Sequence, residues 1–250
     1  MGKIIAIGGG EIGRPHKNGG FYPVETTLID KEIITQTKKK NPKLLFIPTA
    51  SFDSEKYFEV VKKHFSKLNY EVDVLYLIKN KLLKKQIKNK ILSADAVYVG
   101  GGDTLKMITL WKKLGVDKIL KIAYKKGIVL SGLSAGAICW FRCGNSDSKL
   151  KKTGKLIKVP GLNFIDALFC PHYNKEKERK PALKKMMKNT KGIAIAIENC
   201  CALEIIDQKY RVISSKRHTN AYKIYWKDNK YYEEKIKKEK KFESLKKLLY

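Results

Sequence analysis

The chain has 250 residues, 43% of them hydrophobic and 31% charged, which excludes disordered, collagen-like and low-complexity proteins and fits one domain over residues 1–250. Its 53 basic residues exceed its 24 acidic residues and give a net charge of +29, but only five are arginines, the residue type suited to bidentate recognition of phosphates and base edges. The lysines are spread along the chain without a zinc-finger, RNA-recognition or basic-zipper pattern, so specific nucleic-acid binding is not expected.

The first half of the chain alternates short apolar runs with segments of helical spacing, the pattern of a parallel sheet with crossover helices. Strands are predicted at Lys3–Ile7, Lys43–Ile47, Glu71–Tyr76, Ala96–Val99 and Ile128–Leu130. Helices are predicted at Leu28–Lys39, Glu55–Leu68, Leu82–Leu92 and Thr104–Leu114. The fold class is therefore α/β with a mainly parallel central sheet.

From Ile157 onward the predicted strands become shorter, which favours an antiparallel or mixed sheet edge. They lie at Ile157–Val159, Ala167–Cys170, Gly192–Ile197, Ala202–Ile206, Arg211–Ser214 and Ala221–Tyr225, with one helix near Lys180–Lys188. The Lys/Glu-rich tail, Lys230–Tyr250, is predicted to be a docked surface helix. The polar segment Asn145–Thr153 is expected to be the most flexible loop.

The N-terminus and the cysteines indicate a cytoplasmic protein. The apolar stretch that starts at Lys3 is too short for a signal-peptide core, and no apolar run approaches the roughly 20 residues of a membrane span. The five cysteines show neither paired Cys-x-x-Cys motifs nor Cys/His ligand spacing. Reduced, mostly buried thiols are expected.

A Gly-x-Ser-x-Gly sequence at 132–136 follows the strand Ile128–Leu130 and leads into the helix-compatible Ile138–Phe141. At a sharp strand-to-helix turn the glycines leave room for close backbone packing, and the central serine is exposed at a helix N-terminus. Ser134 is therefore the predicted nucleophile. The backbone N–H of Ala135 and the positive helix end could stabilise a developing oxyanion.

A second glycine run, Gly100–Gly102, ends the preceding strand. Because loops at the carboxyl ends of neighbouring parallel strands share one crevice, this run should lie beside Ser134 and could supply the second oxyanion donor. Phosphate binding is disfavoured because neither Gly-x-Gly-x-x-Gly nor Gly-Lys-Ser/Thr is present. The run Gly8–Gly10 is similar but weaker, and close chain packing suffices to explain it.

A serine hydroxyl needs a base, and the chain has four histidines. His172 follows an apolar strand end in the constrained turn Pro171-His172-Tyr173 and is the preferred base. His218, in a loop, is the reserve candidate, whereas His16 and His64 are expected to be solvated.

Three ordered motifs, Val99-Gly100-Gly101-Gly102-Asp103-Thr104, Gly132-Leu133-Ser134-Ala135-Gly136-Ala137 and Pro171-His172-Tyr173, resemble the peptidase E (aspartyl dipeptidase) family of serine peptidases, which is related to cyanophycinase. The resemblance implies a three-layer sandwich like that of the class I glutamine amidotransferases. It also implies that Ser134 is the nucleophile, His172 the general base, and Gly102 and Ala135 the amide donors of the oxyanion hole.

The resemblance further implies a Ser-His-Glu triad, in which Glu198 aligns best as the acid. Asp147 is a competing acid, and Glu204 and Asp207 are more distant ones. The family's substrates are dipeptides with an N-terminal aspartate, whose side chain requires a cation. Candidates near the motifs are Arg142, Lys175 and Arg179.

The sequence therefore predicts a serine dipeptidase that acts on short peptides through an acyl-enzyme on Ser134, without a metal or organic cofactor and without a membrane partner. The oligomeric state stays open, and a homodimer is one option. One alternative is an α/β-hydrolase esterase that uses Ser134, Asp207 and His218. Another is a noncatalytic polyanion-binding protein on the same fold, for which the net charge of +29 would be the active feature.

Overall fold

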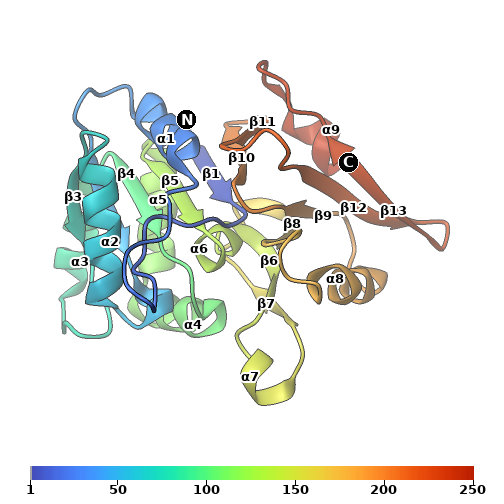
Figure 1. Cartoon of the computed structure of the whole chain (residues 1–250), viewed down its shortest axis with the longest axis horizontal. Coiled ribbons are helices and arrows are strands. Elements are labelled where there is room, and N and C mark those ends of the chain that lie inside the picture. Colours follow the sequence, from blue (N-terminus) through green and yellow to red (C-terminus); the bar gives the residue numbers. More distant parts are fainter. Residues whose placement is uncertain (1) are drawn as a thin grey trace.

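The computed structural model describes residues 2–250 and contains two β-sheets with helices packed against them (Figure 1). The larger sheet has the strand order β14 (Glu243–Ser244), β11 (Lys209–Ser214), β10 (Cys201–Ile206), β1 (Lys3–Ile7), β5 (Val129–Leu133), β4 (Ala96–Val99), β2 (Lys43–Ile47) and β3 (Glu71–Val74). The strands from β1 to β3 in this order run parallel, whereas β10, β11 and β14 pair antiparallel. The predicted α/β class with a mainly parallel central sheet is confirmed.

The smaller sheet is formed by the second half of the chain. Its strand order is β13 (Lys230–Ile236), β12 (Ala221–Lys227), β9 (Ala194–Ile197), β8 (Ile165–Cys170), β6 (Phe141–Ser146) and β7 (Ile157–Pro160). Only β6, β8 and β9 run parallel to one another, and the remaining pairings are antiparallel. The antiparallel or mixed edge predicted for this half is formed by β10 and β11 of the larger sheet, whereas the other predicted strands form a second sheet.

Helices cover both faces of the larger sheet, and α8 (Arg179–Lys188) packs against the smaller one. The helices are α1 (Thr27–Thr37), α2 (Glu55–Ser66), α3 (Lys84–Ser93), α4 (Thr104–Leu114), α5 (Val116–Lys125), α6 (Ala135–Ile138), α7 (Leu150–Thr153), α8 and α9 (Leu245–Leu249), with a 3₁₀ turn η1 at Thr49–Ser51. Apolar residues of α1 and α2 share one core cluster with the sheet, and those of α3, α4 and α5 share the other.

Strand β1 shows how the sequence produces these layers. Its residues are almost all buried, and alternate side chains face opposite sides of the sheet. Ile5 and Ile7 belong to the cluster with α1 and α2, whereas Ile4 and Ala6 belong to the cluster with α4 and α5. A continuous apolar run is what a parallel strand covered on both faces requires.

The tail is the clearest departure from prediction. The segment predicted as a helix over Lys230–Tyr250 forms strand β13, the short strand β14 and only a five-residue helix, α9. Strands β12 and β13 are joined by Asp228 and Asn229, which both have left-handed backbone angles, φ 49° and 59°. Two such residues make the tight turn of a β-hairpin, so the local turn chemistry overrides the Lys/Glu-rich composition.

Two crossings of the chain between the sheets lie close together. After β5 of the larger sheet, Ser134 and α6 lead into β6 of the smaller one, and β9 of the smaller sheet leads into β10 of the larger one. Because β5, β8 and β9 all end near these crossings, the carboxyl ends of strands from both sheets meet there (Figure 1).

The structure also bears on membrane-spanning helices and on the cysteines. Within residues 2–250, no helix combines the length and the apolar character needed to cross a membrane. All five cysteines are free and buried, as expected for reduced thiols.

Candidate active site

Ser134 occupies a strained turn between β5 and α6. Its backbone angles are φ 57° and ψ −112°, a region that a residue with a side chain adopts at a cost of about 1–3 kcal/mol. The turn is held because the Ser134 N–H donates to the carbonyl of Ile7 (3.1 Å) and the Ser134 carbonyl accepts from Ala137 and Ile138 (both 2.9 Å). The sequence prediction of a sharp strand-to-helix turn at this serine is confirmed.

The glycines on either side of Ser134 allow this turn. A Cβ atom on Gly136 would lie 2.0 Å from the carbonyl oxygen of Val99, and one on Gly132 would lie 2.4 Å from the carbonyl oxygen of Gly136. Both contacts are with backbone, which cannot move aside cheaply. The motif therefore has a packing reason at both glycines, independent of any chemistry at the serine.

His172 lies at the end of β8, in a turn pinned to both sheets. It has a left-handed backbone, φ 54°. Its N–H donates to the carbonyl of Gly8 at the end of β1 (3.0 Å), and the N–H of Tyr173 donates to the carbonyl of Ile197 at the end of β9 (3.2 Å). These two bonds fix the imidazole against the junction of the sheets.

The side chains of Ser134, His172 and Asn199 form a hydrogen-bonded chain. His172 Nε2 lies 2.8 Å from Ser134 Oγ, and His172 Nδ1 lies 2.8 Å from Asn199 Oδ1. Because the amide oxygen can only accept, Nδ1 carries the ring proton and the Nε2 lone pair faces the serine hydroxyl. This is the arrangement in which a histidine can take the proton of a serine.

Burial acts on the charge state of the imidazole. It lowers the pKa of His172 below its ordinary value, and the hydrogen bond with Asn199 partly opposes this shift. The neutral form, which is the form that can accept a proton, is thereby favoured at neutral pH.

Glu198, predicted as the acid that orients His172, is directed elsewhere. Its carboxylate accepts from the N–H of Asn220 (2.9 Å) and from the hydroxyl of Tyr222 (3.1 Å), both at the beginning of β12. The chain turns between these two residues: Glu198 directly follows strand β9, whereas Asn199 lies in the turn that leads to β10. Glu198 therefore faces β12, and the following residue, Asn199, faces the imidazole.

The second glycine run lies close to Ser134, as expected from the sequence. A Cβ atom on Gly101 would lie 3.5 Å from Ser134 Cβ, which places this run directly beside the serine. The N–H of Gly101 donates to the hydroxyl of Tyr57 (3.3 Å). Within residues 2–250, the amides of Gly102 and Ala135 donate to no protein acceptor.

Gly9 was not singled out from the sequence, but it makes the contact between His172 and Asn199 sterically feasible. A Cβ atom there would lie 2.2 Å from Asn199 Oδ1 and 2.4 Å from His172 Nδ1. The carbonyl of Gly9 accepts from the N–H of Cys200 (2.7 Å), which anchors the turn that carries Asn199. The signal in the sequence was the run Gly8–Gly10 at the end of a strand that neighbours β5.

Comparisons with known proteins agree with this geometry. The profile described as Peptidase family S51 matches residues 17–213. The uncharacterized peptidase YgaJ of Bacillus subtilis is 37% identical over 227 residues, which cover 90% of this chain and 92% of YgaJ. The chain belongs to peptidase family S51. Peptidase E of a Nostoc species is 27% identical over 186 residues, covering 70% of this chain and 73% of that protein.

A solved structure supports the fold of this S51 member. The crystal structure of a peptidase from an acI-B1 actinobacterium superimposes with a TM-score of 0.73 and 19% identity, and the match covers 98% of this chain and 97% of that one. The sequence matches confirm the predicted resemblance to the peptidase E family and, through the family, the prediction of a peptidase.

The three cations predicted for substrate binding differ in their availability. Arg142 lies near the beginning of β6, away from the carboxyl ends of the strands, and is paired with Asp166 (2.7 Å). Arg179 is buried, pairs with Glu176 (2.7 Å) and donates to the carbonyl of Asn145. Both guanidinium groups are therefore committed to partners within this S51 chain.

Lys175 is the exposed member of the three. It lies in the turn after His172, and its N–H donates to the carbonyl of that histidine (3.0 Å). Within residues 2–250 its ammonium group makes no ion pair.

The alternative acids and bases do not join Ser134 in this S51 chain. Asp207 lies next to Gly2, whose N–H donates to its carboxylate (2.8 Å), and thus at the start of β1. Ser134 is at the other end of that five-residue strand, about 16 Å away at the usual rise per residue. His218 is exposed, and Asp147 is exposed and acts on His172 only through its charge, which partly opposes the effect of burial on the pKa of that imidazole. Glu204 pairs with Arg211 of β11. The chain order Ser134, Asp207, His218 of an α/β-hydrolase is not assembled.

His64, expected to be solvated, is buried. Its Nε2 lies 2.7 Å from a carboxylate oxygen of Asp30, which is fully buried and also accepts from the hydroxyl of Thr26 (2.7 Å). Burial raises the pKa of Asp30. The pair joins α1 to α2 on one face of the sheet, so it belongs to the packing of the S51 fold.

Proposed function

We propose that the protein is a serine peptidase that hydrolyses short peptides through an acyl-enzyme on Ser134. The observation that carries the proposal is the 2.8 Å contact between Ser134 Oγ and the His172 nitrogen that bears a lone pair. In the first step Oγ attacks the scissile carbonyl carbon while its proton passes to Nε2. The imidazolium then gives that proton to the leaving amine, and water, activated in the same way, releases the acid and restores the serine.

The negative charge that develops on the carbonyl oxygen needs donors that are already in place. The amide of Ala135 directly follows Ser134, Gly102 follows the glycine that packs against Ser134, and neither amide has a protein acceptor within residues 2–250. In addition, Ala135 is the first residue of α6, so its N–H would have no partner inside the helix. These two groups supply the oxyanion hole in the proposed mechanism.

Asn199 takes the place of the expected acid in this proposal. Its amide oxygen holds the proton of the imidazole on Nδ1 and sets the ring orientation, as an acid would. Unlike a carboxylate, it adds no full negative charge, so it stabilises the imidazolium less. Glu198 acts one step further away, because its bonds to Asn220 and Tyr222 fix the turn that presents Asn199.

The proposed substrates are dipeptides with an N-terminal aspartate. Two observations support them: the chain resembles peptidase E, and Lys175 offers an unpaired ammonium group three residues after His172. An aspartate side chain bound there would form a charge-assisted hydrogen bond. Arg142 and Arg179 would have to leave their carboxylate partners to do the same.

The test is hydrolysis of a panel of Asp-Xaa and Xaa-Asp dipeptides and one β-aspartyl dipeptide. The proposal predicts cleavage of Asp-Xaa alone and no cleavage by Ser134→Ala. Lys175→Met should raise KM for Asp-Xaa, whereas Lys177→Met, an exposed lysine two residues further on, should leave KM unchanged. Cleavage that survives in Ser134→Ala would contradict the mechanism, and equal cleavage of Xaa-Asp would contradict the substrate.

A further inference from the structure

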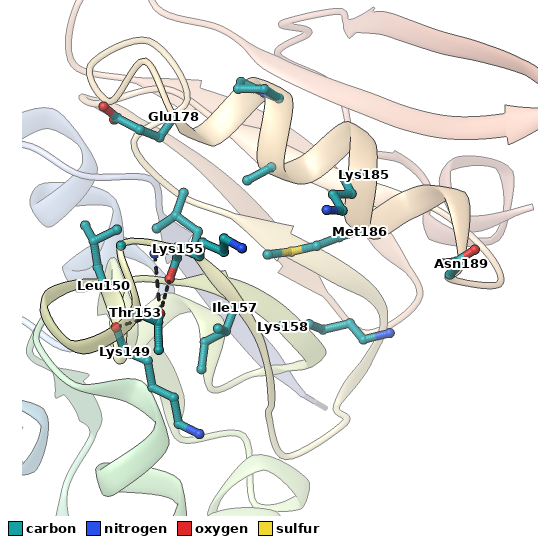
Figure 2. A pocket seen from close by; sticks show the side chains of 14 residues that line it. Lys149, Leu150, Thr153, Lys155, Ile157, Lys158, Glu178, Lys185, Met186 and Asn189 are labelled. Carbon is teal, nitrogen blue, oxygen red and sulfur yellow. Dashed lines mark hydrogen bonds between the residues drawn. The ribbon is translucent and has the colours of Figure 1, made fainter.

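A cavity lies outside the candidate active site. It is a groove of about 880 Å³ between α8 and the segment Lys149–Lys158, which includes α7 and the beginning of β7. This segment is called the α7 arm below. The two walls of the groove are seen in Figure 2, where Lys155 of the arm and Met186 of α8 extend toward one another.

The groove combines an apolar lining with a basic rim. The apolar residues are Leu150, Leu156, Ile157, Pro181, Ala182 and Met186. The charged residues are Lys149, Lys155, Lys158, Lys185 and a single acid, Glu178. Within residues 2–250, none of these four lysines is paired with a carboxylate. An occupant of complementary chemistry would carry both apolar and acidic side chains.

Both walls of the groove begin beside the candidate active site. The α7 arm follows the end of β6, which runs parallel to β8 and ends alongside the strand end that carries His172. Helix α8 begins at Arg179, seven residues after His172. The two beginnings are tied together, since Arg179 donates to the carbonyl of Asn145 and the Asn145 side chain donates to the carbonyl of Arg179.

The size of the groove sets the length of an occupant. Its lining runs from Glu178 to Asn189, the whole length of the ten-residue helix α8, which is about 15 Å at the usual helical rise. An extended peptide covers that distance with about four or five residues. Because alternate side chains of an extended peptide face opposite sides, one set can meet the apolar lining while the other meets the lysines.

We propose that this groove binds the extended, acidic and apolar part of a peptide substrate that follows the scissile bond, so that the enzyme accepts peptides longer than dipeptides. The inference rests on the proposed peptidase function, because it takes the active site as the place where the bound peptide is cut. It assigns to the groove a role in substrate selection: peptides with alternating acidic and apolar residues are bound, and basic peptides are repelled.

Binding is tested without catalysis, on the full chain carrying Ser134→Ala. The probe is fluorescein-labelled Glu-Leu-Glu-Leu-Glu, followed by fluorescence anisotropy at about 150 mM salt, where exposed charges are largely screened. Reversing two rim charges, Lys155→Glu with Lys185→Glu, should weaken binding at least tenfold. The matched control is Lys118→Glu with Lys121→Glu, two exposed lysines of α5 outside the groove with the same change in net charge.

Three outcomes of these binding experiments would contradict the inference. Equal loss in both double variants would mean that overall charge, not the groove, attracts the probe. Equal binding of Glu-Gly-Glu-Gly-Glu would show that the apolar lining plays no part. A change in sedimentation mass on charge reversal in the groove alone would show that the groove is occupied by a second copy of the chain.

Activity separates this inference from the proposed function. With the serine intact, the groove variant should lower kcat/KM for Asp-Leu-Glu-Leu-Glu at least tenfold and leave kcat/KM for Asp-Leu unchanged. Loss of both activities in equal measure would contradict the groove as a substrate site. Failure of the peptidase proposal itself has a different signature, namely no serine-dependent cleavage of either peptide while the probe still binds.

Discussion

The side chain of Asn199 is the proposed group that orients the imidazole of His172. Asn199→Ala removes the acceptor that lies 2.8 Å from His172 Nδ1. The ring becomes charged as the serine attacks, and a hydrogen bond to a charged group contributes about 1.5–3 kcal/mol. At 1.36 kcal/mol for each factor of ten, kcat should fall about 10- to 150-fold. KM should stay unchanged, because Asn199 contacts the histidine and not the proposed substrate.

The variant Asn199→Asp tests the same contact through pH. A carboxylate at that distance would favour the imidazolium and raise the pKa of His172, by about one to three units for a close opposite charge. Because the base must be neutral, the acid limb of kcat/KM should move to higher pH by that amount. A residue that only supported the local fold would lower activity without moving this limb.

Glu198→Gln is the matched control for Asn199, since it changes the neighbouring residue and keeps an oxygen that can accept from Asn220. Its kcat should stay within about threefold of the wild type. The assay is steady-state hydrolysis of an Asp-Xaa dipeptide between pH 4.5 and 9. A hundredfold loss in Glu198→Gln together with near-normal Asn199→Ala would refute the reasoning and restore the expected acid.

Three further predictions concern the surrounding structure. Gly9→Ala should lower kcat about 100-fold, since its Cβ would displace the imidazole and its amide partner; Gly19→Ala, which meets open space, should not, and equal effects would contradict this. Because burial lowers the pKa of His172, the acid limb of wild-type kcat/KM should lie below about pH 6.5, the ordinary histidine value, and a limb above it would be contrary evidence. His64→Ala should lower the free energy of unfolding in urea by about 2 kcal/mol, because it leaves the buried Asp30 carboxyl without its hydrogen-bond partner on α2; an unchanged midpoint would count against a structural role.

Much of the larger sheet could be predicted because its strands are buried on both faces. Such strands are continuous apolar runs that end at glycine or proline, and Lys3–Ile7, Lys43–Ile47 and Ala96–Val99 have the predicted bounds. The turn at Ser134 was predictable for the same kind of reason, since its flanking glycines are dictated by backbone contacts of 2.0 and 2.4 Å. In these places the residue types along a short stretch of sequence were enough to predict the structure.

The features that were missed depend on contacts between distant segments. Which of Glu198 and Asn199 faces the imidazole depends on the bonds that hold Glu198 against Asn220 and Tyr222, more than twenty residues away. Similarly, the burial of His64 depends on Asp30, 34 residues earlier in the chain. The cations Arg142 and Arg179 resembled candidates for substrate binding only while their carboxylate partners were unknown.

The most direct test of the central claim is mass spectrometry of the intact chain and its peptides after reaction with a fluorophosphonate, which phosphonylates activated serines. The account predicts one adduct per chain, on the peptide that contains Ser134, absent in Ser134→Ala and formed much more slowly in His172→Ala. Cleavage of Asp-Xaa dipeptides by a chain whose Ser134 remains unlabelled, or an adduct on another serine, would contradict it.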